Sequence, residues 1–120
     1  MIPAHLESFW STPRLATFGT VRADGTPHLV PVKAMRVAED LMVLTRPETV
    51  KVRNIRRTGR ASLAERTPTL WATVEGAARV SDDADTLAAA RAAYQERYGR
   101  PDTWGTCVIV LTPEQVLHGA

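Results

Sequence analysis

One short stretch, residues 41–61, holds most of the side chains that could do chemistry in this chain. Six of its residues are Lys or Arg and only Glu48 opposes them, whereas the whole chain has a formal net charge of only +2. This concentration of positive charge predicts a site for an anion such as a phosphate group. The residues that we assign to the site are Thr45, Arg46, Lys51 and Asn54. Lys51 and Asn54 are at positions i and i+3, so they share one face of a helix.

The elements predicted around this stretch would position an anion. Residues 41–44 form an apolar run that is typical of a strand, and the pattern from Pro47 to Gly59 predicts a short helix. Pro47 suits the first helical position and Glu48 the first turn, near the positive end of the helix dipole. Free N–H groups at such a helix N-terminus bind anions. The alternative stays open that the arginines are solvated or only stabilise the C-terminal end of the helix.

The composition excludes several classes of protein. A chain of 120 residues with 44% hydrophobic residues suits one globular domain, residues 1–120. No apolar run reaches the ~18 residues that a membrane span needs, and the N-terminus lacks the charged and apolar regions of a signal peptide. Cys107 is the only cysteine, so we expect no disulfide and a cytoplasmic protein. The histidines are scattered along the chain, so we expect no metal site.

The rest of the chain predicts mainly β structure with helical insertions. Asp24-Gly25 lies between two β-rich runs and predicts a hairpin. Pro31 lies within a predicted strand and cannot donate to a ladder, so it belongs at an edge or a bulge, where backbone groups can face a ligand. Because strands and helices do not alternate regularly, a small antiparallel barrel fits better than a doubly wound sheet. The predicted strands are residues 15–21, 27–37, 41–44, 60–65, 70–80 and 107–111, and the predicted helices are a short N-terminal one at 2–10, the basic one and one at 81–98.

Side chains that would carry out a reaction by themselves are not signalled. The chain has no GxSxG, GxGxxG or P-loop motif and no Ser-His-Asp pattern. Cys107 lies in the middle of a predicted strand, where we expect a buried, inert thiol. We assign Tyr94 and Tyr98 to the core, and Trp71 and Trp104 to the starts of strands, as core or interface residues. If the chain is an enzyme, a cofactor therefore carries the chemistry and the protein positions it.

Three segments of the sequence carry a resemblance to a known family. They are LATFGTVRADGTPHLVPVKA at 15–34, LTRPETVKVRNIRRTGRASL at 44–63 and LWATVEGAARV at 70–80. Over residues 14–118 the chain resembles the pyridoxamine 5′-phosphate oxidase-like split β-barrel family, and most closely the branch that binds the deazaflavin coenzyme F-420. The resemblance implies a six-stranded antiparallel split β-barrel of the FMN-binding type. It also implies a homodimer with two cofactor sites at the interface.

The resemblance assigns roles to individual residues. The backbone of the second strand would line a flat tricyclic ring, and the strand-to-helix turn would bind the phosphate, in agreement with the charge argument. The fifth strand would reach the cofactor of the other subunit near Trp71. The ring-lining residues that it implies are Val30, Pro31, Val32 and Lys33, and the phosphate-site residues are Thr45, Arg46 and Lys51, with Asn54 nearby.

Two departures from the family pattern favour the deazaflavin over flavin mononucleotide (FMN). Val50 precedes Lys51, where flavin-using oxidases of this family usually have a basic residue. The chain also lacks the C-terminal segment with which pyridoxamine phosphate oxidases bind their substrate. A third departure concerns the substrate, because Lys33-Ala34 replaces bulky aromatics and would open the pocket. Lys33 would then bind an anionic substrate or polarise a carbonyl group, or else be an exposed strand lysine.

These interpretations lead to one principal hypothesis and two alternatives. The principal one is an F-420-dependent oxidoreductase that transfers hydride to a small unsaturated or carbonyl substrate. The alternatives are an FMN-dependent oxidase or flavin reductase of the same fold, and a non-enzymatic cofactor carrier. Nucleic acid is not an expected partner, because the basic stretch contains no aromatic residue on which bases could stack.

Overall fold

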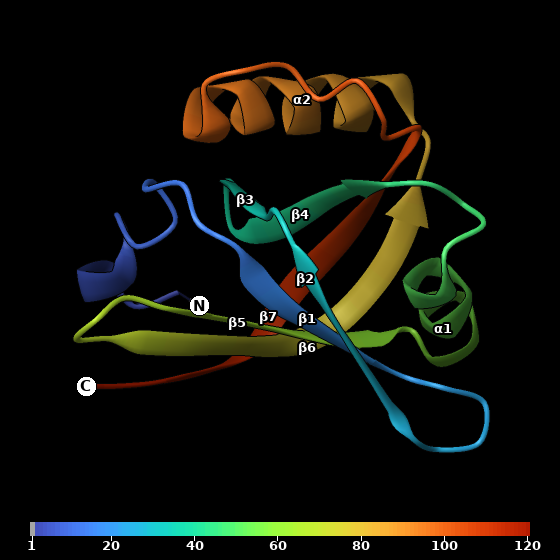
Figure 1. The fold of residues 1–120 in the computed structure, drawn as a ribbon, viewed down its shortest axis with the longest axis horizontal. Coiled ribbons are helices and arrows are strands. Elements are labelled where there is room, and N and C mark those ends of the chain that lie inside the picture. The colour runs from blue at the N-terminus through green and yellow to red at the C-terminus, as the bar shows by residue number, and fades with distance from the viewer. Residues whose placement is uncertain (1) are drawn as a thin grey trace.

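The computed structural model describes residues 2–120, which form a seven-stranded antiparallel sheet with two α-helices. In Figure 1 the sheet curves through the lower part of the molecule, α2 lies across the top and α1 covers one side. Within residues 2–120, no helix is long and apolar enough to cross a membrane. The strands are β1 Ala16–Val21, β2 Pro27–Val32, β3 Met35–Val37, β4 Asp40–Thr45, β5 Arg60–Arg66, β6 Trp71–Ser81 and β7 Cys107–Gly119.

The strand order corrects the expected six-stranded closed barrel. The order is β2-β1-β5-β6-β7-β4-β3, so β2 and β3 are the two edges and no ladder closes the sheet. Residues 27–37, predicted as a single strand, form two strands, β2 and β3, which are separated by Lys33 and Ala34. These two strands are the opposite edges of the sheet. Because only these two residues join the edges, the sheet has to curl until its ends meet. Pro31 lies on the edge strand β2 opposite Thr17, as predicted for a residue that cannot donate to a ladder.

The first hairpin agrees with the sequence prediction, and the final strand is longer than predicted. The Asp24-Gly25 turn joins β1 to β2 as predicted, with Gly25 at φ 87° and the Asp24 carboxylate accepting from the Thr26 N–H at 3.0 Å. The last strand is longer than the predicted 107–111, because residues 112–119 continue to pair with β6. A register shift between Glu75 and Gly76 accommodates the bend of β6.

The basic helix α1, Val50–Thr58, begins later than predicted. Pro47 and Glu48 precede it, and its first turn contains no acidic residue. The reason is a turn before the helix, in which the Thr49 backbone N–H and hydroxyl both donate to the Arg46 carbonyl, at 3.3 and 3.0 Å. The helix ends as predicted at Gly59, which has φ 67° and donates its N–H to Ile55 at 2.7 Å.

The helices cover two separate parts of the core. Helix α1 buries Val52 and Ile55 in the main cluster, against the inner face of the sheet. The N-terminal segment is a single 3₁₀ turn, η1 Ala4–Leu6, and not the predicted helix 2–10. Its apolar spacing was still informative, because Leu6, Phe9 and Trp10 are all buried in the main cluster.

Helix α2, Ala84–Tyr98, packs on a second cluster formed with β3, β4 and β7. It begins after Asp83, whose carboxylate accepts the Thr86 N–H at 3.0 Å, and ends at Gly99. Ala90 and Tyr94 are its buried contacts to this cluster. The helix therefore covers the strands around residues 33 and 34, the connection between the two sheet edges.

A buried ion pair between Arg97 and Glu65 connects α2 to β5, and Arg97 also contacts the connection at residues 33 and 34. Arg97 and Glu65 are 5% and 4% exposed, and their side chains meet at 2.7 Å and 3.2 Å through two parallel contacts. Arg97 Nη1 also donates to the Ala34 carbonyl at 2.6 Å, and Arg14 Nε reaches Glu65 at 3.1 Å. The Tyr98 hydroxyl donates to the same Ala34 carbonyl at 2.8 Å. Residues 33 and 34 are thus held in place from the helix.

Candidate functional site

Four of the predicted site residues meet in one hollow, which we call the lysine hollow. It lies where the end of β2 approaches β4, α1 and α2, and has a volume of about 280 Å³. The predicted residues that line it are Pro31, Val32, Lys33 and Lys51. The remaining lining residues, which the sequence did not assign to a site, are Val43, Leu44, Tyr94, Asp102 and Trp104.

Lys51 enters the lysine hollow from the first turn of α1. It is half-buried, and no carboxylate of residues 2–120 lies within ion-pair distance of it. Burial is the main cause that lowers the pKa of Lys51, against a smaller opposing effect of Cys107. A half-buried ammonium group without a counter-ion is suited to receive an anionic ligand.

Lys33 enters from the other side, at the end of β2. Its ammonium group lies 3.4 Å from the Tyr94 hydroxyl and 5.9 and 5.7 Å from the ring centres of Tyr94 and Tyr98. Among the described residues it has no carboxylate partner either. The lysine hollow therefore has two cationic groups, and neither forms an ion pair with Asp102, the carboxylate of its described lining, whose Oδ2 accepts the Gly105 N–H at 2.8 Å.

The turn between β4 and α1 forms a wall beside Lys51. Thr45 is fully buried, and its hydroxyl lies 3.4 Å from that of Thr49. Arg46 donates from Nε to the Trp104 carbonyl at 2.9 Å, and its guanidinium lies 5.3 Å from the centre of the indole ring. Val50 is half-buried at the start of α1. Two predicted phosphate-site residues, Thr45 and Arg46, thus lie next to the hollow without lining it.

Three other predicted residues lie outside the lysine hollow. Asn54 is buried and faces β1, where its Nδ2 donates to the Thr20 hydroxyl at 3.0 Å, so its side chain serves the packing of α1. Val30 packs against the main core cluster. Trp71 is 41% exposed at the start of β6, where it pairs with Gly119. Trp71 does not line the lysine hollow.

Two residues of the hollow, Tyr94 and Trp104, have contacts that the sequence analysis did not predict. Tyr94 is buried in a core cluster, as predicted, but its hydroxyl also reaches Lys33 across a separation of 61 residues. Trp104 does not begin a strand, since it lies in the loop before β7 and stacks under Arg46. Neither role has a local signal, because each depends on which strand faces which helix. Cys107 is buried as predicted, and burial is the main cause that raises its pKa.

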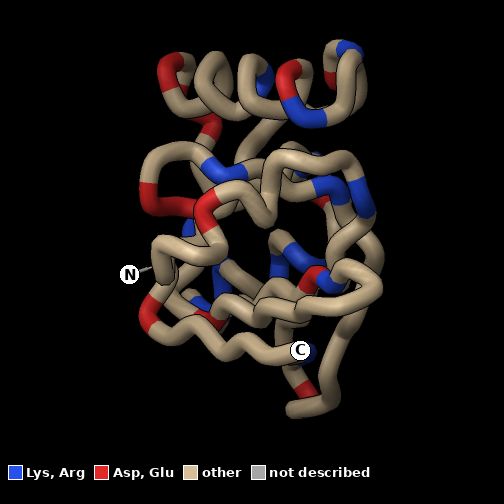
Figure 2. Tube along the Cα trace, turned by 90° about the vertical axis from the view of Figure 1, so that its left-hand side faces the viewer, with Lys and Arg blue, Asp and Glu red and all other residues tan. Residues whose placement is uncertain are grey.

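The charge of Lys51 affects the pKa of His28 on β2. His28 is half-buried on that strand, and its Nδ1 is buried without a hydrogen-bond partner among residues 2–120. Burial first, and then the charges of Arg22 and Lys51, lower the pKa of His28. In Figure 2, Lys and Arg occur both in α2 at the top and in the sheet below. What distinguishes the lysine hollow is therefore that neither of its lysines forms an ion pair with a described carboxylate, and not the amount of positive charge.

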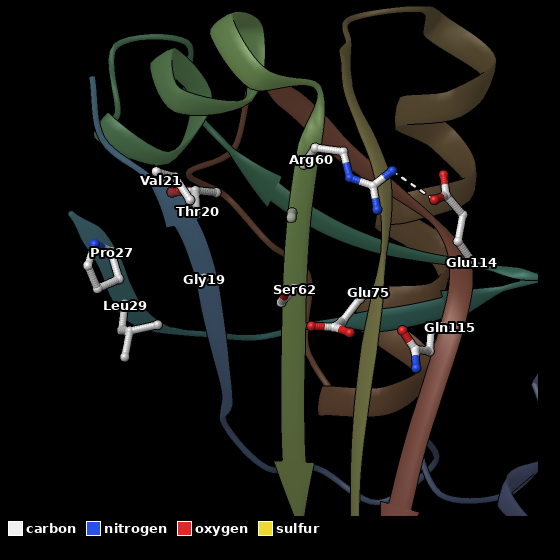
Figure 3. Close-up of a pocket in the computed structure, with 11 residues that line it drawn as sticks. Gly19, Thr20, Val21, Pro27, Leu29, Arg60, Ser62, Glu75, Glu114 and Gln115 are labelled. Atoms are coloured by element: carbon white, nitrogen blue, oxygen red, sulfur yellow. Dashed lines mark hydrogen bonds and ion pairs between the residues drawn. The ribbon is translucent and has the colours of Figure 1, made fainter. Parts of the chain in front are cut away.

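A larger, open depression of about 600 Å³ lies on the solvent-facing side of the sheet, and we call the surface that lines it the outer face. Figure 3 shows it crossing the strands from Leu29 through Gly19 and Ser62 to Glu75 and Gln115. These residues are register partners on neighbouring strands, so they form one row. Its only ion pair joins Arg60 and Glu114 at 2.7 Å among the described residues that line it. None of the predicted site residues lies in it.

The chain is a small antiparallel β protein that has a basic hollow between an edge strand and a helix N-terminus. This chain belongs to the pyridoxamine 5'-phosphate oxidase family, because residues 2–118 match that family. The family and its F420-dependent branch are what the sequence predicted, and both are confirmed.

Three relatives show how far the similarity extends. The chain is 33% identical over 99 residues to a protein named F420H(2)-dependent biliverdin reductase from Mycobacterium tuberculosis (strain CDC 1551 / Oshkosh). The aligned residues cover 78% of this chain and 70% of that protein. A solved structure named F420 reductase has a TM-score of 0.78 at 23% identity, over 97% of this chain and 98% of that one. A heme binding protein from Mycobacterium smegmatis has a TM-score of 0.74 at 23% identity, over 99% and 55%. The fold alone therefore does not distinguish between these cofactors.

Proposed function

We propose that this chain is an F-420-dependent oxidoreductase that reduces a small unsaturated or carbonyl substrate. The observation that carries the proposal is the pair of half-buried lysines, Lys33 and Lys51, that line one hollow and form no ion pair with a described carboxylate, Asp102 of the same lining included. The 33% identity to an F420H(2)-dependent biliverdin reductase supports the deazaflavin as the cofactor.

The residues of the lysine hollow fit such a cofactor. Lys51 would hold its phosphate group, next to the turn formed by Thr45 and Arg46. The edge strand at Pro31 and Val32 would line the flat ring, since backbone groups of an edge strand have no ladder partner on their outer side. Lys33 would lie on the substrate side. The reduced deazaflavin, when bound, supplies a hydride, and the protein orients the substrate and excludes water.

FMN is the alternative cofactor, and the family name supports it. We place it second because the half-buried, uncharged Val50 stands directly before Lys51. A single cationic group at this point offers less compensation to a terminal phosphate monoester, which carries close to two negative charges at neutral pH, than to a phosphodiester that carries one. A cytoplasmic location follows from the same proposal, and the single buried thiol Cys107 agrees with a reducing compartment.

Parallel fluorescence titrations of the purified chain with coenzyme F-420, FMN and haem test the proposed function. We expect micromolar or tighter binding of F-420 and weaker binding of the other two. A preference for FMN would move the oxidase or flavin reductase alternative to first place, and a preference for haem would support a carrier. If none of the three binds, the lysine hollow is not a cofactor site.

We further propose that two copies of the chain associate through the outer face. Leu29 and Val21 are exposed there, at 66% and 46%, beside small residues that allow close approach, Gly19 and Ser62. An exposed apolar surface of this kind is typical of an interface.

Light scattering during gel filtration measures this association. We expect the mass of a dimer for the natural chain and of a monomer for Leu29→Arg, because an unpaired guanidinium would have to be buried at the interface. Ala89→Arg, on the exposed surface of α2, is the control and should remain dimeric. A monomeric natural chain would refute the proposed dimer.

A further inference from the structure

The Tyr94 hydroxyl has a donor beside it but no acceptor. Lys33 donates to the phenol oxygen at 3.4 Å, and an ammonium group can only donate. The phenol oxygen therefore accepts this bond, and its own O–H must point elsewhere. Among residues 2–120 no acceptor lies within hydrogen-bond distance of it. Since Tyr94 lines the lysine hollow, the free O–H is available to a molecule that occupies the hollow.

The neighbouring tyrosine shows the contrast. The Tyr98 hydroxyl donates to the carbonyls of Ala34 and Arg14, at 2.8 and 3.3 Å, so the fold itself uses its proton. Burial, the main cause, raises the pKa of Tyr98 to about 12, which keeps it a neutral donor. Tyr94 and Tyr98 lie one helical turn apart with ring centres separated by 4.9 Å, yet only Tyr94 has an unused donor.

The surroundings hold the Tyr94 ring and the backbone next to Lys33 in place. Tyr94 is only 7% exposed and packs in the cluster beneath α2. The residue after Lys33 is Ala34, whose carbonyl accepts from both Arg97 and Tyr98. Donors fixed in a sheltered hollow stabilise a developing negative charge more than water does, because they need no reorganisation when the charge forms.

We propose that Lys33 and Tyr94 form an oxyanion-binding pair that receives the carbonyl oxygen of the substrate. The substrate class is then an aldehyde, a ketone or an α,β-unsaturated carbonyl compound, and not an isolated alkene, which has no such oxygen. The role of the pair in reduction rests on the proposed function, whereas its capacity to bind an oxyanion does not.

The reaction step balances with groups already named. When bound, the reduced deazaflavin would supply the hydride that the electrophilic carbon of the substrate accepts, and it would itself be oxidised. The π electron pair moves to the carbonyl oxygen, where it produces an alkoxide or enolate between Lys33 and Tyr94. Tyr94 transfers its proton to that oxygen, and Lys33 stabilises the resulting phenolate until water returns the proton.

Binding of 4-nitrophenolate to the full chain without cofactor tests the oxyanion site directly, because the absorbance of this oxyanion changes when it is bound. We expect Tyr94→Phe to weaken binding about tenfold and Lys33→Met at least as much, since each change removes one donor to a charged oxygen. Tyr98→Phe is the matched control, because Tyr98 does not line the hollow and its hydroxyl is engaged with Ala34 and Arg14. It should lower the melting temperature but leave binding within about twofold.

The outcomes separate this inference from the proposed function. If Tyr94→Phe and Lys33→Met bind the probe like the natural chain, or if only Lys51→Met weakens binding, the oxyanion pair is refuted even though the chain binds F-420. If both variants weaken probe binding but no deazaflavin binds, the oxyanion pair stands and the proposed reductase fails. With F-420 bound, Tyr94→Phe should keep the affinity for the cofactor and slow the reduction of 4-nitrobenzaldehyde about tenfold or more.

Discussion

Replacing Arg97 by alanine is expected to lower the free energy of unfolding by about 3 kcal/mol, because the change leaves the Glu65 carboxylate buried without its main partner. The two side chains are 3% and 0% exposed, so water cannot replace the lost guanidinium. Arg14 still contacts Glu65, which places the expected loss at the lower end of the usual range for such changes. A loss of this size is a large part of the roughly 5–15 kcal/mol that stabilises a typical domain.

Urea denaturation followed by far-ultraviolet circular dichroism measures this loss. Arg53→Ala on the exposed face of α1 is the control, and should change the unfolding free energy by no more than about 0.5 kcal/mol. In the double variant Arg97→Ala and Glu65→Ala, the total loss should be smaller than the sum of the two single losses, because no buried charge is left unpaired. Additive losses would show that the ion pair is not what holds α2 in place.

Replacing Lys51 by methionine is expected to weaken F-420 binding by roughly 10- to 100-fold, the usual cost of losing a hydrogen bond to a charged group. The unfolding free energy should not fall at neutral pH. Burial lowers the pKa of Lys51, so the folded chain holds that proton less tightly than the unfolded chain does. The resulting cost to stability is present below the folded-state pKa and disappears as the pH rises toward the unfolded-state pKa. Methionine keeps the apolar stem of the side chain and removes that cost.

Fluorescence titration and thermal unfolding of the same samples separate binding from stability. Arg79→Met, at an exposed position of β6 that does not line the lysine hollow, removes the same charge and should leave the affinity within about twofold. Unchanged affinity in Lys51→Met would remove Lys51 from the cofactor site. A loss of affinity together with a large loss of stability would instead indicate a structural role.

Features set by neighbouring residues could be predicted from the sequence. The hairpin at Asp24-Gly25 and the helix end at Gly59 follow from backbone conformations that few other residues adopt. The edge position of Pro31 follows from its missing N–H. The start of α1 was misplaced, because the competing turn at Arg46 and Thr49 uses hydrogen bonds that composition does not reveal.

Features set by distant residues could not be predicted. The interruption at Lys33 and Ala34 depends on Arg97 and Tyr98, more than 60 positions away in the chain. The same distance separates Lys33 from Tyr94, so the sequence identified one half of the pair and assigned the other half to the core. The charge pattern and the family resemblance both indicated the phosphate-site residues, but Asn54 among them has its amide engaged with Thr20. The sequence could not show this, because it depends on how α1 rotates against β1.

The two open edges of the sheet also determine how this protein avoids aggregation through its edge strands. An exposed edge strand is a template on which another chain can add a strand and begin to aggregate. Edge strand β2 contains two prolines, Pro27 and Pro31, and the opposite edge β3 is only three residues long. Neither edge offers a continuous row of donors and acceptors to a foreign strand. The chain can therefore keep backbone groups free beside its hollow without exposing a seed for fibril growth.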